Sequence, residues 1–130
     1  MPRSAMRLTR MVNLVGLLVF TLSLAAGQIL FKKTALAMSG VPFVEGLRAV
    51  LVEPLLYAAL ALYGLTTLLW IWLLSRIPLT QAHPFMAASI IIVPVLSVLL
   101  LGERVSYVFW IGITFVTVGV LLTQLGIVRQ

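Results

Sequence analysis

"RMVNLVGLLVFTLSLAAGQILFKK", residues 10 to 33, determines the fold class of this chain. Between Arg10 and Lys32 it holds 21 residues without Asp, Glu, Lys or Arg. About 20 apolar residues in a helix cross the roughly 30 Å hydrocarbon core of a bilayer. The stretch therefore predicts a transmembrane helix with basic residues at both ends.

Three further uncharged runs follow, at residues 54–75, 77–102 and 105–128. Of the 130 residues, 62% are hydrophobic and 9% are charged, and the mean hydropathy is +1.20; a soluble domain has about a quarter charged residues. A cleaved signal peptide is the alternative for the first run, but that run is long and three more follow it. We expect an all-α integral membrane protein: a basic arm over 1–10, then one domain over 11–128 with helices at about 11–31, 54–75, 79–101 and 107–128.

The connections between these helices differ in length. Within the long connection, residues 32–53, Phe43, Leu47, Val50 and Leu51 recur at helical spacing, which predicts a short interfacial helix; a plain loop is the alternative. The turns "RIP" and "GERVS" are short, so the last three helices should form an antiparallel series. The basic residues divide five against four between the two sides, which slightly favours a cytoplasmic N-terminus.

Composition also limits the chemistry. The chain has no cysteine, one histidine and three glutamates, so we expect neither a metal site nor a cofactor. No nucleophile–base arrangement is recognisable, and we expect no enzyme activity. The net charge of +6 is attributed to interfacial side chains facing anionic lipid headgroups rather than to nucleic-acid binding.

The last helix carries Gly112, Gly119 and Gly126 at intervals of seven, close to one face. Glycine allows helix backbones to approach closely in lipid. The stripe predicts a dimer seam, with packing against the third helix of the same chain as the alternative.

The third helix, "LTQAHPFMAASIIIVPVLS", contains Pro84 and Pro94, each of which removes a backbone donor. Polar residues accompany them in this apolar segment, so a bent helix lining a cavity is predicted, against a helix merely kinked for packing. The expected lining residues are Gln81, His83, Pro84 and Ser89.

The end of the first helix offers a candidate anion site. Gln28 and Lys32 are four residues apart and share a face, whereas Lys33 points about 100° away and is expected to be a snorkelling anchor. Gln28 and Lys32 together are predicted to bind a phosphate headgroup, with a snorkelling anchor as the alternative role of Lys32. The other charged residues of that side are expected to contribute: Arg48, Glu103 and Arg104. For Glu103 and Arg104, fixing the turn geometry is the alternative role. No helix interior contains Asp or Glu, which argues against a cationic cargo.

Three segments carry a resemblance to a known family: "GQILFKK", "LLWIWLLSRIPLTQAHPF" and "LGERVSYVFWIGITFVTVGVLL". Over residues 14 to 125 the chain resembles the small four-helix members of the drug/metabolite transporter superfamily (EamA-like and small-multidrug-resistance-like proteins). It looks most like the aminoarabinose-phosphoundecaprenol flippase subunits. The matching residues are Gly27, Gln28, Lys32, Pro78, Ala82, Pro84, Glu103, Val105, Ser106, Trp110 and Gly112.

Two departures from these relatives affect the expected cargo. Leu24 stands where the multidrug exporters carry a glutamate, and His83 replaces a tyrosine common in the flippase subunits. The resemblance implies a flippase subunit of the bacterial inner membrane, which moves a polyprenyl-phosphate-linked sugar as a homodimer or with a similar small subunit. The alternatives are a small multidrug or metabolite exporter, and a non-transporting subunit that scaffolds a glycosyltransferase.

Overall fold

The computed structural model describes residues 3–128, and the side chains of residues 7–126. Its elements are α1 (Arg3–Ala35), η1 (Leu36–Met38), α2 (Phe43–Val52), α3 (Pro54–Leu74), α4 (Leu79–Ala87), α5 (Ser89–Leu101) and α6 (Tyr107–Val128). The described residues include no strand. Four segments are long and apolar enough to cross a membrane: α1 from Arg7, α3, α4 with α5, and α6. The predicted all-α membrane fold is confirmed.

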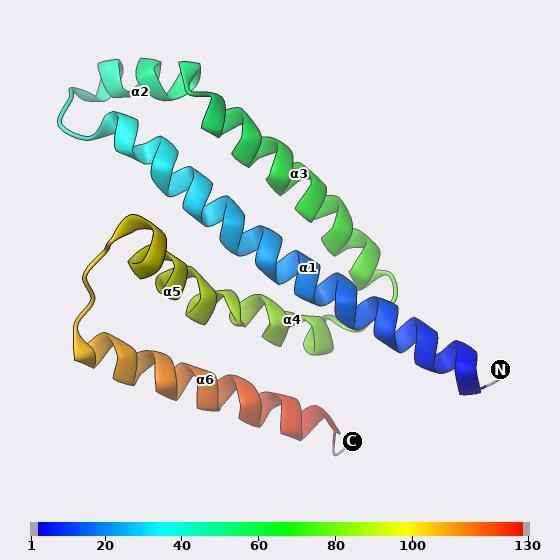
Figure 1. Ribbon diagram of the computed structural model, residues 1–130. Helices are drawn as coiled ribbons and strands as arrows, with labels where there is room; N and C mark the ends of the chain where they lie inside the picture. Colours follow the sequence, from blue (N-terminus) through cyan, green and yellow to red (C-terminus); the bar gives the residue numbers. More distant parts are fainter. Residues whose placement is uncertain (1–2, 129–130) are drawn as a thin grey trace.

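The helices lie in a row in the order α3, α1, α4–α5 and α6 (Figure 1). Consecutive spans run antiparallel, as the short turns predict for the last three (Figure 1). However, α1 lies between α3 and the α4–α5 span, so these two neighbours in sequence meet mainly at their connection. At the outer edge, α6 packs only lightly, against α4 and α5.

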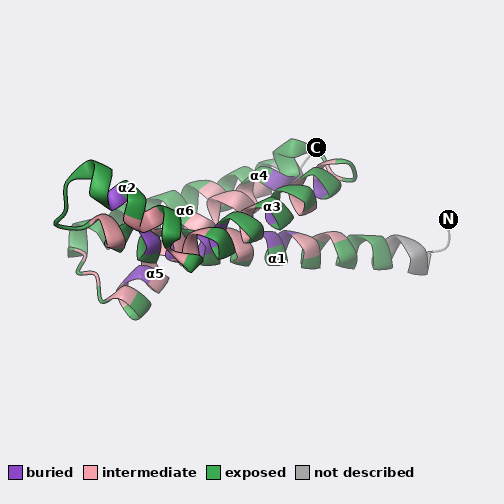
Figure 2. Cartoon of the chain, turned by 90° about the horizontal axis from the view of Figure 1, so that it is seen from above, coloured by how far each residue is buried: buried purple, intermediate pink, exposed green. Residues whose placement is uncertain are grey.

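The buried core is small and lies along α1. Leu17 and Phe20 pack with Leu73 and Ala82, and the Phe20 ring stacks on Trp70 with centroids 4.4 Å apart. Figure 2 shows exposed residues over much of the remaining helix surface, and large apolar side chains account for many of them. Apolar helix surface of this extent is suited to lipid contact.

The first helix is longer than the 11–31 expected. Residues 3–10, predicted as a separate arm, are its first turns, and it continues through Lys32 and Lys33 to Ala35. Long basic side chains can extend along a helix to reach the membrane–water interface. A helix can therefore continue beyond its first charged residue, and charged residues are poor markers of helix ends. At 33 residues, α1 is about 50 Å long, more than a hydrocarbon core requires.

The third span, expected as one bent helix, is divided at Ala88 into α4 and α5. Pro84 lies within α4 and Pro94 within α5, and each lacks a backbone donor. The carbonyl of Phe85, next to the break, lies 3.0 Å from the Thr21 hydroxyl of α1, which is also 2.9 Å from the Leu17 carbonyl. A neighbouring helix thus supplies a hydrogen bond where the span is interrupted.

The long connection contains the predicted short helix, α2, rather than a plain loop. Its apolar residues Phe43, Leu47 and Leu51 are exposed, while Gly46 is buried against η1. A Cβ at Gly46 would lie 3.2 Å from the Met38 Cα. The absence of a side chain at residue 46 therefore lets α2 lie close to η1, at the same end of the molecule as Lys32.

Candidate functional site

Lys32 forms an ion pair that the sequence does not reveal. Its Nζ lies 3.0 Å from Glu103 Oε1, in the connection between α5 and α6. The two side chains are 52% and 39% exposed, so the pair lies near the surface, where such pairs contribute little to stability. Lys32 is thus held in place, yet remains accessible to a second anion.

Glu103 is fixed by three interactions around Gly102. Gly102 has a φ of +67°, the left-handed conformation that ends α5. This turn directs the Glu103 backbone N–H to the Ser97 carbonyl (3.4 Å), and the Ser97 hydroxyl donates to Glu103 Oε2 (2.5 Å). Hydrogen bonds from Ser97 and then Lys32 lower the pKa of the Glu103 carboxyl below its ordinary value of 4.5. Glu103 is therefore an anion at neutral pH and orients Lys32.

Gln28 makes its contact on another side of α1. Its Nε2 donates to the Tyr63 hydroxyl of α3 at 2.6 Å. Tyr63 fits there because residue 27 is glycine: a Cβ at Gly27 would lie 2.2 Å from the Tyr63 ring. Phe31 packs on the same ring, with centroids 5.0 Å apart. The motif "GQILF" thus forms the surface of α1 on which Tyr63 packs, a contact that the sequence did not predict.

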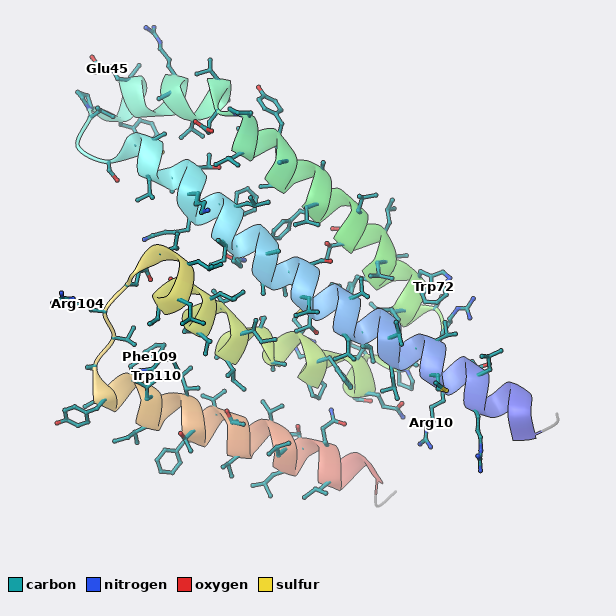
Figure 3. All side chains as sticks on the ribbon, viewed as in Figure 1. Arg10, Glu45, Trp72, Arg104, Phe109 and Trp110 are labelled. Carbon is teal, nitrogen blue, oxygen red and sulfur yellow. The ribbon has the colours of Figure 1, made fainter. Side chains whose placement is uncertain are left out.

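The predicted anchor Lys33 and the residues predicted to contribute to the headgroup site, Arg48 and Arg104, lie at the same end of the molecule but do not make these contacts. Lys33 is exposed at the end of α1, and Arg48 is exposed on α2. Arg104 points away from the bundle, at the end opposite Arg10 (Figure 3). The structure therefore brings together Lys32 and Glu103, and leaves Gln28, Arg48 and Arg104 outside that cluster.

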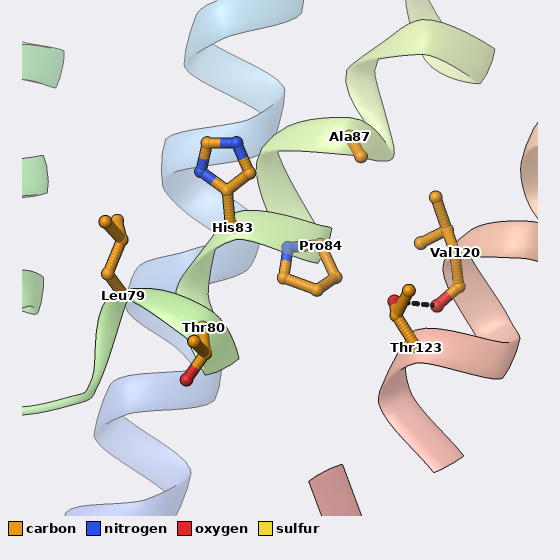
Figure 4. Close-up of a pocket in the computed structure, with 7 residues that line it drawn as sticks. All are labelled: Leu79, Thr80, His83, Pro84, Ala87, Val120 and Thr123. Atoms are coloured by element: carbon orange, nitrogen blue, oxygen red, sulfur yellow. Dashed lines mark hydrogen bonds between the residues drawn. The ribbon is translucent and has the colours of Figure 1, made fainter. Parts of the chain in front are cut away.

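The residues predicted to line one cavity are distributed over three separate clefts. His83 and Pro84 line a cleft of about 610 Å³ between α4 and α6, across from Val120 and Thr123 (Figure 4). Ser89 lines a second cleft, of about 340 Å³, between α1, α5 and α6, with Leu24 and Gln28. Gln81 lines a third, of about 410 Å³, near the chain termini.

The α6 helix contributes to all three clefts, although its sequence predicts a dimer seam. A Cβ added at Gly112, Gly119 or Gly126 would have no atom of another described element within 4 Å. The glycine face of α6 is therefore open. At 100° per residue, the glycine stripe and the cleft-lining face are about 100° apart. A partner could therefore pack on the glycine face without filling the clefts.

The third cleft also contains residues that sequence reasoning missed: Arg10, Asn13 and Gln124. Asn13 and Gln124 are amides within uncharged runs, the signal that had drawn attention to Gln28. Among the described residues, no group of three His, Cys, Asp or Glu side chains gathers in a way suited to a metal ion. The polar residues of the third cleft and of the Lys32–Glu103 pair are amides and charged groups. Such groups can bind a polar headgroup by hydrogen bonds and charge.

Comparison with known proteins agrees with this architecture. The model of the EamA-like transporter family matches residues 8–125. The chain belongs to this family. A probable 4-amino-4-deoxy-L-arabinose-phosphoundecaprenol flippase subunit ArnE of Aeromonas hydrophila is 34% identical over 111 residues, 85% of this chain and 96% of the relative.

Two further relatives carry the same description. The protein from Aeromonas salmonicida is 31% identical over the same shares of both chains. The protein from Hamiltonella defensa is 40% identical over 60 residues, 46% of this chain and 54% of the relative. No solved structure matches the chain. The predicted membership of the drug/metabolite transporter superfamily is confirmed.

Proposed function

We propose that this protein is a subunit of a lipid translocase that moves a polyprenyl-phosphate-linked sugar across the bacterial inner membrane. The observation that carries the proposal is end-to-end similarity: the flippase subunit of Aeromonas hydrophila aligns over 96% of its length at 34% identity. The relatives are described as transport proteins. Accordingly, translocation is proposed to involve no covalent step and no cofactor.

Lys32 is the proposed ligand of the lipid phosphate. A phosphate that reaches Lys32 competes with the Glu103 carboxylate 3.0 Å away. Glu103 retains its hydrogen bond from Ser97 when Lys32 turns to the phosphate, so the exchange leaves no carboxylate without a donor. Arg48 and Arg104, on the same end, strengthen the field that attracts the anion.

The exporter alternative requires a carboxylate within the membrane to bind a cation. The carboxylate side chains of the described segment, Glu45, Glu53 and Glu103, all lie outside the four spans. Leu24, at the position of the exporters' glutamate, lines the apolar cleft between α1, α5 and α6. These features favour an anionic headgroup over a lipophilic cation.

A dimer is proposed as the active assembly, with a second copy or a similar small subunit packed on the glycine face of α6. This helix packs lightly within the chain, and its glycines offer close approach to another helix. The five basic residues on the side of the termini support a cytoplasmic N-terminus.

The decisive experiment is translocation in proteoliposomes. The chain, alone and with a co-expressed small partner, is reconstituted with labelled undecaprenyl-phosphate-linked sugar, and leaflet exchange is followed by label accessibility. Transport above protein-free vesicles is expected. Binding of tetraphenylphosphonium without transport of any polyprenyl phosphate would support the exporter. A stable complex with a glycosyltransferase, again without lipid transport, would support the scaffold.

A further inference from the structure

The third cleft lies at the end of the molecule opposite Lys32. Its walls are formed by Arg10, Asn13, Leu14 and Leu17 of α1, Ile77 before α4, Gln81 and Phe85 of α4, and Gln124 of α6. We call it the terminal-side cleft, because both chain termini lie at this end (Figure 1). Arg10 and Lys32 are 22 residues apart on α1, about 33 Å along the helix axis. This distance spans a hydrocarbon core, so the two positions face opposite leaflets.

Two amides in this cleft each have one buried atom without a hydrogen-bond partner among the described residues. Asn13 Oδ1 and Gln124 Nε2 are inaccessible to solvent and have no hydrogen-bond partner among the described residues. An unpaired polar atom in a membrane protein is costly, and native structures normally satisfy such atoms. One atom is an acceptor and the other a donor, and a hydroxyl group can serve as the partner of either kind.

Within the described part of the chain, no carboxylate side chain compensates the positive charge of this end. The carboxylate side chains of the described segment belong to Glu45, Glu53 and Glu103, which lie on the opposite end with α2 and the α5–α6 connection. Arg76 stacks on the Trp72 ring at 4.1 Å, whereas Arg10 is exposed at the mouth of the terminal-side cleft. No carboxylate side chain of the described part is near enough to neutralise Arg10. Arg10 therefore favours binding of an anion to the terminal-side cleft, and the unpaired amide atoms of Asn13 and Gln124 favour hydroxyl groups.

We infer that the terminal-side cleft is a second headgroup site, which binds a phosphate-linked sugar in the leaflet opposite Lys32. Arg10 binds the phosphate, and Asn13 and Gln124, assisted by Gln81, bind sugar hydroxyls. The inference rests on the proposed function and extends it, because the chain then holds one headgroup position in each leaflet. A polyprenyl phosphate without sugar would use only the Arg10 part of the site.

The test compares two lipid probes with variants of the full chain, in whichever assembly transports lipid in proteoliposomes. The probes are undecaprenyl phosphate and an undecaprenyl-phosphate-linked hexose, with phosphatidylglycerol as a competing anionic lipid. Arg10→Gln should weaken binding of both probes at the terminal-side cleft by about tenfold or more and leave their binding at Lys32 intact. Arg7→Gln, which removes the same charge outside the cleft, is the matched control and should change binding less than about twofold.

Asn13→Leu and Gln124→Leu place apolar side chains in apolar spans, so folding should be retained. Each should weaken binding of the sugar-linked probe severalfold and leave undecaprenyl phosphate unchanged. Equal effects of Arg10→Gln and Arg7→Gln, or full displacement of the probes by phosphatidylglycerol, would reduce the cleft to a general anionic-lipid contact and overturn the inference. Unchanged sugar-linked binding in both leucine variants would mean that the amides hold water, and would also overturn it.

Failure of the proposed function gives a different result. In that case the wild-type chain moves no polyprenyl-phosphate lipid. If only the second site is wrong, wild type and all cleft variants transport equally well.

Discussion

The two ends of α1 carry polar groups in opposite conditions. At the Lys32 end, Glu103 pairs with Lys32 and accepts a hydrogen bond from Ser97. Gln28 donates a hydrogen bond to Tyr63. At the Arg10 end, Asn13 and Gln124 each leave an atom unpaired, and no described carboxylate side chain is near Arg10. A ligand that binds Lys32 must therefore displace Glu103. A ligand that binds Asn13 or Gln124 at their unpaired atoms displaces no protein group of the described chain. The four experiments below test this contrast.

The largest effect is expected at Gly27, which underlies the self-satisfied end. In Gly27→Ala the new Cβ would overlap the Tyr63 ring, which Phe31 and Gln28 hold in place. The free energy of unfolding should fall by about 1–3 kcal/mol, as measured by thermal or chemical unfolding in detergent. Gly64→Ala, where an added Cβ meets nothing within 4 Å, should be close to neutral; equal losses in both variants would contradict the proposed packing.

The next effect concerns the two lysines. Lys32→Ala removes the proposed phosphate ligand and should lower binding of undecaprenyl phosphate about tenfold, measured in nanodiscs. Lys33→Ala is the matched control, because it removes the same charge one residue away and should change affinity less than about twofold. Normal lipid binding and transport by Lys32→Ala would exclude Lys32 as the ligand.

A smaller effect, in the opposite direction, is expected at Glu103. Glu103→Gln keeps an acceptor for Ser97 but frees Lys32, so undecaprenyl phosphate should bind about two- to fivefold more tightly. Glu45→Gln on α2 makes the same charge change at the same end without touching Lys32. Weaker binding in Glu103→Gln would show instead that the carboxylate is needed to position Lys32 for its ligand.

The smallest effect is the pH dependence of the pair. Because the pKa of Glu103 is lowered in the folded protein, its contribution to stability is complete above its ordinary value of 4.5. The contribution declines as the pH falls below that value and is lost beneath the lowered pKa. The Tm difference between wild type and Glu103→Gln should therefore narrow as the pH falls below 4.5. A difference independent of pH in that range would mean that the pair does not stabilise the fold.

The spans were predictable, because bilayer thickness fixes the length of an uncharged run. The short helix α2 was predictable too, from the spacing of Phe43, Leu47 and Leu51. Which helices become neighbours was not. The tight turn before Pro78 suggested that the second and third spans pack together, yet α1 lies between them. Turn length sets direction but not lateral order, and therefore Tyr63 could not be assigned to Gln28.

The candidate site was predicted in part. Lys32 and Glu103 were both selected as charged residues at span ends, but their pairing depends on how the Gly102 turn is directed, which only the assembled chain shows. Asn13 and Gln124 were not predicted, although each is, like Gln28, an amide in a long apolar run. The rule applied to Gln28, that an amide inside a membrane needs a partner, would have singled out both.

The break at Ala88 has a mechanical consequence. A continuous helix resists bending because bending breaks backbone hydrogen bonds. Ala88 keeps its bonds to Pro84 and Ile92, but the Phe85 carbonyl accepts from Thr21 of α1, and Pro94 has no N–H to donate. The span therefore resists bending less here than a continuous helix would. α4 forms one wall of the terminal-side cleft, and α5 leads to Glu103. A change of angle between α4 and α5 would therefore move a wall of the terminal-side cleft relative to the connection that carries Glu103.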